Sequence, residues 1–153
     1  MERIVLDTNC LLQIISYNSQ YNVVWDRIRS GEVALCVSTD ILLEYTEILT
    51  RFISVGVADN IVNTIKMLPN TEYIKPRFNW AMLPDPDDNK FVDCAVTADA
   101  KYIVSDDKHF KVLKKKDTWP KVDLKTLKEY HKHLTNDLSG IKKRKRTTKT
   151  TKK

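Results

Sequence analysis

Short apolar runs alternate with amphipathic stretches along most of this chain. Arg3–Leu6, Glu32–Val37 and Lys101–Val104 are rich in β-branched and aliphatic residues and stop at polar residues, which is typical of buried strands. Thr71–Lys75 is a further candidate strand, and a weak one is expected near Val122. The pattern therefore predicts a sheet built from short, mostly buried strands.

Helical spacing of apolar residues predicts helices between these strands. The clearest helix covers residues 40–53, where Ile41, Tyr45 and Leu49 recur on one face. Further helices are expected at Val23–Ile28, at 58–68, from the Asp85–Asn89 segment to about Asp99, and at Leu124–Leu134. Strands that alternate with helices indicate a three-layer α/β/α fold with a central, mostly parallel sheet.

The composition fits one globular domain. The chain has 153 residues, of which 42% are hydrophobic and 30% charged, with only 3 Gly and 5 Pro, and this excludes collagen-like and broadly disordered proteins. No apolar run approaches the roughly 20 residues that span a bilayer, and the N-terminus lacks the pattern of a secretory signal. We expect a cytoplasmic protein without a membrane partner.

The charge is unevenly distributed. The net charge is +6, but residues 141–153 hold eight Lys or Arg and no acid, which leaves −2 for residues 1–140. We predict a folded domain over residues 1–137 and a basic, disordered tail over residues 138–153. This tail either remains a solvated extension or attracts RNA phosphates. The candidate RNA-binding residues in it are Lys142, Lys143, Arg144, Lys145 and Arg146.

The cysteines and histidines do not form a recognisable metal motif. Cys10, Cys36 and Cys94 are odd in number, widely spaced and flanked by apolar residues, so buried reduced thiols are expected rather than disulfides or a zinc site. His131 and His133 are two residues apart on a predicted helix and would point to different faces.

Four acids stand where the predicted fold brings them to one edge of the sheet. Asp7 and Asp107 follow strands, Glu44 lies on the helix after the second strand, and Asp88 lies at a helix start. Neighbouring carboxylates repel one another unless a cation neutralises them, and oxygen-only ligands favour Mg²⁺ or Mn²⁺. The chemistry that uses such a site is phosphodiester hydrolysis by a metal-activated water.

Each acid also has a simpler interpretation. Asp88 could cap a helix, and Glu44 could be an ordinary exposed acid. Asp7 is harder to dismiss, because the apolar residues around it make a lone charge costly. Asp7 could instead be the nucleophile of an aspartyl phosphatase, although Asn9 stands where such an enzyme needs a second Asp.

The acids lie within segments that resemble a known family. The segments Ile4-Val5-Leu6-Asp7-Thr8-Asn9, Glu44 in its leucine-rich helix, Asp85-Pro86-Asp87-Asp88-Asn89-Lys90-Phe91 and Tyr102-Ile103-Val104-Ser105-Asp106-Asp107-Lys108 resemble the PIN domain. The similarity is closest to the bacterial branch that contains toxin components of toxin-antitoxin pairs. It covers roughly residues 1–134 and leaves out the basic tail.

The resemblance implies a Mg²⁺- or Mn²⁺-dependent endoribonuclease that cleaves single-stranded or structured RNA, often as a homodimer and with a small antitoxin as partner. It implies that Asp7, Glu44, Asp88 and Asp107 are the catalytic, metal-binding acids, and that Thr8 or Asn9 and Ser105 orient them through hydrogen bonds. Asp93 is either a further ligand or a residue of the helix surface. The alternative is a catalytically weak PIN-like module that binds RNA or protein.

Overall fold

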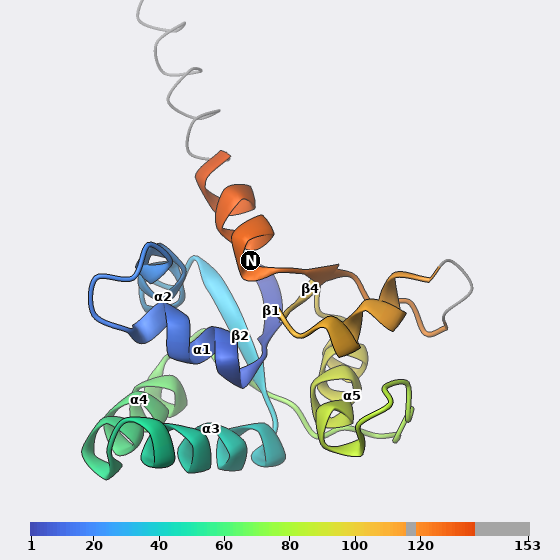
Figure 1. Ribbon diagram of the computed structural model, residues 1–153, viewed down its shortest axis with the longest axis horizontal. Helices are drawn as coiled ribbons and strands as arrows, with labels where there is room; N and C mark the ends of the chain where they lie inside the picture. Colours follow the sequence, from blue (N-terminus) through green and yellow to red (C-terminus); the bar gives the residue numbers. More distant parts are fainter. Residues whose placement is uncertain (116–118, 137–153) are drawn as a thin grey trace, which may run out of the picture.

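The computed structural model describes residues 1–115 and 119–136 (Figure 1). The strands are β1 (Glu2–Leu6), β2 (Val33–Val37), β3 (Glu72–Tyr73), β4 (Tyr102–Val104) and β5 (Leu124–Lys125). The α-helices are α1 (Thr8–Ile15), α2 (Asn22–Arg29), α3 (Thr39–Phe52), α4 (Val55–Met67) and α5 (Asn89–Ala98). Two 3₁₀ segments, η1 (Pro86–Asp88) and η2 (Lys108–Lys114), and helical residues 127–136 complete the described chain.

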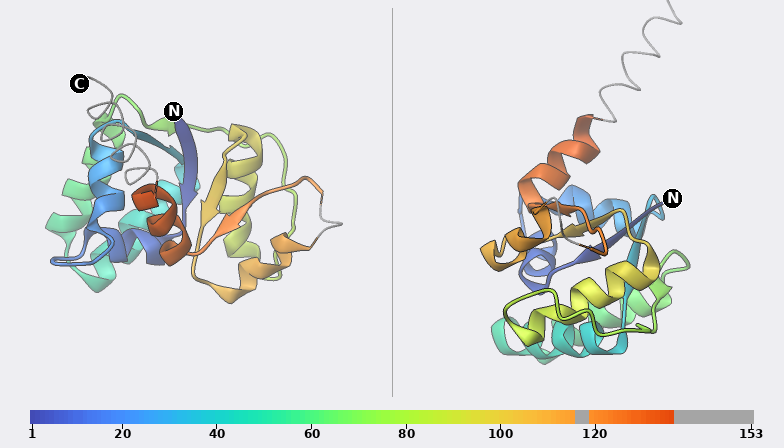
Figure 2. Two further views of the ribbon diagram at one scale, coloured as in Figure 1. Left: turned by 90° about the horizontal axis from the view of Figure 1, so that it is seen from above. Right: turned by 90° about the vertical axis from the view of Figure 1, so that its right-hand side faces the viewer.

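The five strands form one sheet in the order β3-β2-β1-β4-β5, and every pair of neighbours is parallel. Seen from above, α5 lies on one side of the strands, whereas α1, α2 and α4 lie on the other (Figure 2, left). Helix α3 contacts both α1 and α5. The predicted three-layer α/β/α fold with a parallel sheet is therefore confirmed.

The core fills the space between the sheet and its helices. All five residues of β2 are buried, as expected for a parallel strand that is covered on both faces. The fully buried Tyr45 of α3 donates a hydrogen bond from its hydroxyl to the backbone carbonyl of Leu6, so α3 is tied to the end of β1. Cys10, Cys36 and Cys94 are free and buried, as predicted.

Local capping explains where the two long helices begin. The Ser38 hydroxyl accepts a hydrogen bond from the backbone N–H of Ile41 at 3.3 Å, and α3 starts at the next residue, Thr39. The Ser54 hydroxyl accepts from the N–H of Val57 at 3.1 Å, so α4 begins before the predicted residue 58. The sequence alone located α3 closely because its cap precedes a regular apolar face.

Two elements differ from the prediction. Helix α1 was not predicted, although Asp7 at its N-cap is a residue type that favours helix starts; its side chain makes no capping hydrogen bond. The prediction of a helix from Leu124 is wrong at its start, because Leu124 and Lys125 pair with β4 as β5 and the helix begins at residue 127. There the backbone N–H of Leu127 donates to the Asp106 carboxylate at 2.8 Å, a contact between distant parts of the chain.

The predicted tail over 138–153, with its five candidate RNA-binding residues, lies outside the described residues. Within residues 1–115 and 119–136, no helix is long and apolar enough to span a membrane.

Candidate active site at the carboxyl ends of β1 and β4

The site begins where β1 and β4 end side by side. Leu6 pairs with Val104, and the backbone N–H of Asp7 donates to the Val104 carbonyl at 3.0 Å. This register places Asp7 next to Ser105, whose hydroxyl donates to the Asp7 carboxylate at 2.8 Å. The pairing of two parallel strands therefore brings together residues that are 98 positions apart.

Asp7 is a buried acid with acidic neighbours. Only 7% of its surface is exposed. Burial raises the pKa of its carboxyl group, the hydrogen bonds from Ser105 and from the Thr8 backbone lower it, and the nearby carboxylates of Glu44 and Asp107 raise it again, with a net upward shift. The free energy of the ionised form is thus higher than in water, and a cation would lower it.

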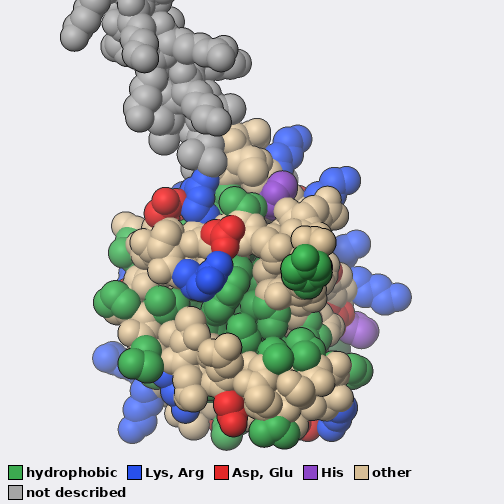
Figure 3. Space-filling view, turned by 90° about the vertical axis from the view of Figure 1, so that its left-hand side faces the viewer, with side chains coloured by type: hydrophobic (Ala, Val, Ile, Leu, Met, Phe, Trp, Pro, Cys, Tyr) green, Lys and Arg blue, Asp and Glu red, His purple; other side chains and the backbone are tan. Residues whose placement is uncertain are grey.

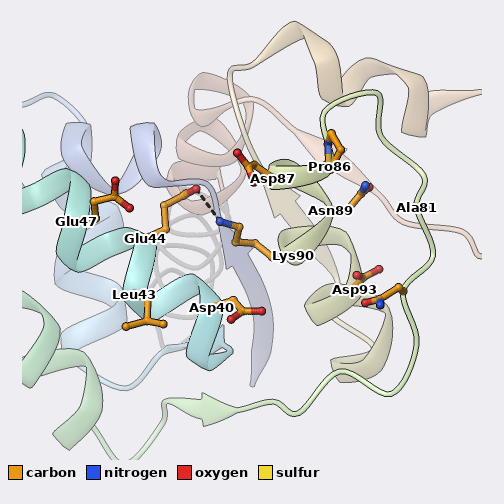
Figure 4. Close-up of a pocket in the computed structure, with 11 residues that line it drawn as sticks. Asp40, Leu43, Glu44, Glu47, Ala81, Pro86, Asp87, Asn89, Lys90 and Asp93 are labelled. Atoms are coloured by element: carbon orange, nitrogen blue, oxygen red, sulfur yellow. Dashed lines mark hydrogen bonds and ion pairs between the residues drawn. The ribbon is translucent and has the colours of Figure 1, made fainter.

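Glu44 lies in the second turn of α3 and faces the end of β1. One of its carboxylate oxygens accepts a hydrogen bond from the hydroxyl of Thr8, which is 96% buried. The other oxygen lies 3.0 Å from Nζ of Lys90, on the first turn of α5 (Figure 4). Both carboxylate oxygens of Glu44 thus have a partner, Thr8 and Lys90, which argues against the interpretation of Glu44 as an ordinary exposed acid.

Asp88 is the last residue of η1 and the N-cap of α5, but its side chain makes no capping hydrogen bond to that helix. Its carboxyl pKa is raised to about 6, first by burial and then by the carboxylates of Asp85, Asp107, Asp7 and Glu44. The simple capping role is thus absent in this structure. Asp85 caps the segment instead, since its carboxylate accepts from the N–H of Asp87 at 3.0 Å.

Asp107 has a structural contact in addition to its place near the other acids. Its carboxylate accepts a hydrogen bond from the backbone N–H of His109 at 2.9 Å and caps η2. The same oxygen lies 2.9 Å from Nδ1 of the His109 ring. The Asp107 N–H donates to the Ser105 hydroxyl at 3.1 Å, so Ser105 links Asp7 to Asp107.

Asp93 and Asn9 have surroundings that the sequence did not reveal. Asp93 is 6% exposed, so the helix-surface interpretation is wrong. Its carboxylate accepts the backbone N–H of Trp80 at 2.9 Å and thereby holds the long loop before η1 against α5. Burial raises its pKa. Asn9 is exposed.

A pocket of about 590 Å³ opens beside the site, between α3, α5 and the loop that precedes η1 (Figure 4). Five acidic side chains line it together with Lys90, namely Asp40, Glu44, Glu47, Asp87 and Asp93. Sequence analysis singled out Glu44 and Asp93 but not Lys90. Its position two residues after Asp88 gave no signal, because residues two apart on a helix point to different faces.

The four acids thus lie near one another without forming a closed ligand set. In the part of the chain that the structure describes, no three His, Cys, Asp or Glu side chains are grouped so that they could hold a metal ion as they stand. The donor chemistry nevertheless fits a hard cation, because all four groups are carboxylates and the pKa values of Asp7 and Asp88 are raised by burial and by their acidic neighbours. Glu44 would have to leave Lys90 to join such a set.

Comparison with known proteins identifies the family. Residues 3–109 match the PIN domain, and the chain belongs to this family. PIN domains are generally nucleases. No curated protein matches the chain significantly.

Two solved structures share the fold. One is VapBC2 from Rickettsia felis bound to a DNA fragment from its promoter, with a TM-score of 0.55 and 14% identity over 81% of this chain and 98% of that chain. The other is DNA-bound VapBC from Salmonella typhimurium, with a TM-score of 0.51 and 14% identity over 83% of this chain and 99% of that chain. At this identity the likeness concerns the fold.

Proposed function

We propose that this protein is a metal-dependent endoribonuclease that cleaves single-stranded RNA. The observation that carries the proposal is the gathering of acids beside the carboxyl ends of β1 and β4, where Ser105 links Asp7 to Asp107 and the charges of Glu44 and Asp107 act on Asp7 and Asp88. Ligands of parallel α/β sheets bind at this edge. Family membership supports nuclease activity, and the choice of RNA rests on the resemblance of the motifs.

The four acids would hold Mg²⁺ or Mn²⁺. A divalent cation, when bound, polarises a phosphoryl oxygen and lowers the pKa of a water molecule. The chain supplies the orientation: the Ser105 hydroxyl fixes one Asp7 oxygen, and the Thr8 hydroxyl fixes one Glu44 oxygen. Because Asp7 and Thr8 are buried, these contacts are shielded from bulk water, which strengthens them.

The direct test uses Asp7→Asn, which removes a charge with little change in shape. Cleavage of a labelled single-stranded RNA is measured with Mn²⁺, with Mg²⁺ and with EDTA. We expect metal-dependent cleavage by the wild type and none by the variant, while circular dichroism shows the same fold for both. Equal cleavage by both proteins, or none by the wild type, would refute the proposal.

We further propose that the protein is the toxin of a toxin-antitoxin pair. Support comes from the similar folds of the two VapBC structures. Hydrophobic side chains also gather over the middle of the face that carries α2 and α4, with most basic side chains in this view toward its edges (Figure 3). Contiguous apolar patches of this kind are typical of protein contacts.

The toxin role is tested by expressing this protein alone and together with the product of an adjacent small reading frame. A true antitoxin restores growth and copurifies with this protein.

A further inference from the structure

We propose that Lys90 is a phosphate-binding residue, whose ammonium group is held by Glu44 in the free protein and passes to a phosphate of the RNA when substrate lies over the four acids. The proposal rests on the proposed nuclease function and extends it to a residue outside the metal-binding set. It starts from the ion pair between Lys90 Nζ and Glu44 Oε1, at 3.0 Å.

The position of Lys90 suits this role. It lies on the first turn of α5, two residues after Asp88, and its side chain reaches across the pocket toward α3 (Figure 4). A hydrogen bond from the preceding loop fixes the first residue of this helix. The backbone N–H of Leu83 donates to the side-chain oxygen of Asn89 at 2.8 Å. Lys90 therefore extends from a well-anchored helix start toward the four acids of the site.

The site is rich in negative charge, so an RNA phosphate that binds there needs a positively charged side chain as a partner. An RNA phosphate at this edge meets the negative charges of Asp7, Asp88 and Asp107 as well as that of Glu44. Within residues 1–115 and 119–136, the ion pairs of these four acids are Lys90 with Glu44 and His109 with Asp107. A histidine is charged only when protonated, whereas lysine keeps its charge at neutral pH.

The exchange of partners is energetically accessible. The two side chains are 21% and 22% exposed, so the ion pair is partly buried but open to solvent and to an approaching phosphate. Glu44 keeps the Thr8 hydroxyl as a partner after Lys90 leaves. An ammonium group on a flexible stem binds phosphate as a point charge and needs no fixed orientation.

The test separates phosphate binding from simple neutralisation of Glu44. Binding of a fluorescein-labelled single-stranded RNA to the full chain is followed by anisotropy in EDTA, between 50 and 200 mM salt. The proteins compared are the wild type, Glu44→Gln, and Glu44→Gln combined with Lys90→Gln or with Lys90→Arg. Lys66→Gln in the Glu44→Gln background is the matched control, since Lys66 is exposed on α4 and does not line the pocket.

We expect Glu44→Gln to bind RNA more tightly than the wild type, because it frees Lys90 and removes one negative charge. Adding Lys90→Gln should weaken binding several-fold and reduce the slope of log K against log salt by about 0.7, the value for one single-stranded phosphate contact. Lys90→Arg should keep most of the affinity, and Lys66→Gln should match its Glu44→Gln parent.

If Lys90 only balances Glu44, its removal in the Glu44→Gln background changes neither the affinity nor the slope, and the proposal is overturned. The cleavage assay with Mn²⁺ is run on the same wild-type preparation. Normal cleavage with no effect of Lys90→Gln on binding rejects the lysine role alone. A binding effect without any cleavage by the wild type supports the lysine role and rejects the nuclease.

Discussion

Replacing Asp88 by Asn should stabilise the metal-free protein at neutral pH. The pKa of this carboxyl group is raised from 3.8 to about 6 by burial and by the neighbouring acids. A shift of that size would correspond to roughly 3 kcal/mol if all of it reached the folding free energy. Because the Asp88 side chain is partly exposed and solvent screens it, we expect a gain of about 1 kcal/mol.

The sign of the pH dependence follows from proton binding. Between the unfolded pKa of 3.8 and the folded value of about 6, the folded state holds more protons at Asp88, so its contribution to stability falls as pH rises. Above about 6 the full cost of ionisation is present, and well below 3.8 it is absent. The difference between Asp88→Asn and the wild type should therefore be largest above pH 7 and close to zero near pH 3.5.

Thermal unfolding in EDTA at a series of pH values measures this difference. A gain of about 1 kcal/mol corresponds to a rise of about 3 °C in Tm for a domain of this size. Asp87→Asn is the control, because Asp87 is the exposed neighbour in the same 3₁₀ segment. A variant that is less stable than the wild type at pH 7.5, or a difference independent of pH, would refute the electrostatic reasoning.

Two further substitutions test contacts that hold the fold. Asn70→Ala should cost about 1–3 kcal/mol in urea unfolding, because the buried Asn70 amide donates at 2.8 and 2.7 Å to backbone carbonyls of α2 and β2; a loss below about 0.5 kcal/mol would contradict this. Burial raises the pKa of Glu2, but the hydrogen bonds from Tyr130 and His133, together with the charges of His133 and Lys101, outweigh it and lower the pKa overall. Ionised Glu2 thus stabilises the fold above its ordinary pKa of 4.5, and this contribution is lost as pH falls through the lower folded value. Glu2→Gln should therefore be less stable by about 1 kcal/mol at pH 7 and equal to the wild type near pH 3.

Local pattern was sufficient for the class of fold and for most elements. Apolar runs of strand length and the 3.6-residue period of α3 are local properties, since each depends on which faces of one segment are buried. The positions of Asp7 and Asp107 after strands also follow from local pattern, because the ends of parallel strands share one edge of the sheet. The helix α1 escaped prediction although Asp7, a residue type that favours helix starts, stands at its N-cap.

The tertiary structure decided which of the predicted residues touch and what each one does. Lys90 meets Glu44 from 46 positions away, and Asp93 is buried against the backbone of Trp80 rather than placed on a helix surface. Such contacts depend on how α5 and its preceding loop pack against α3, and no local period encodes that packing. The sequence by itself therefore determined the parallel α/β layout and the acids at its edge, whereas only the packing of distant segments decided their partners, because burial and charge pairing act through space rather than along the chain.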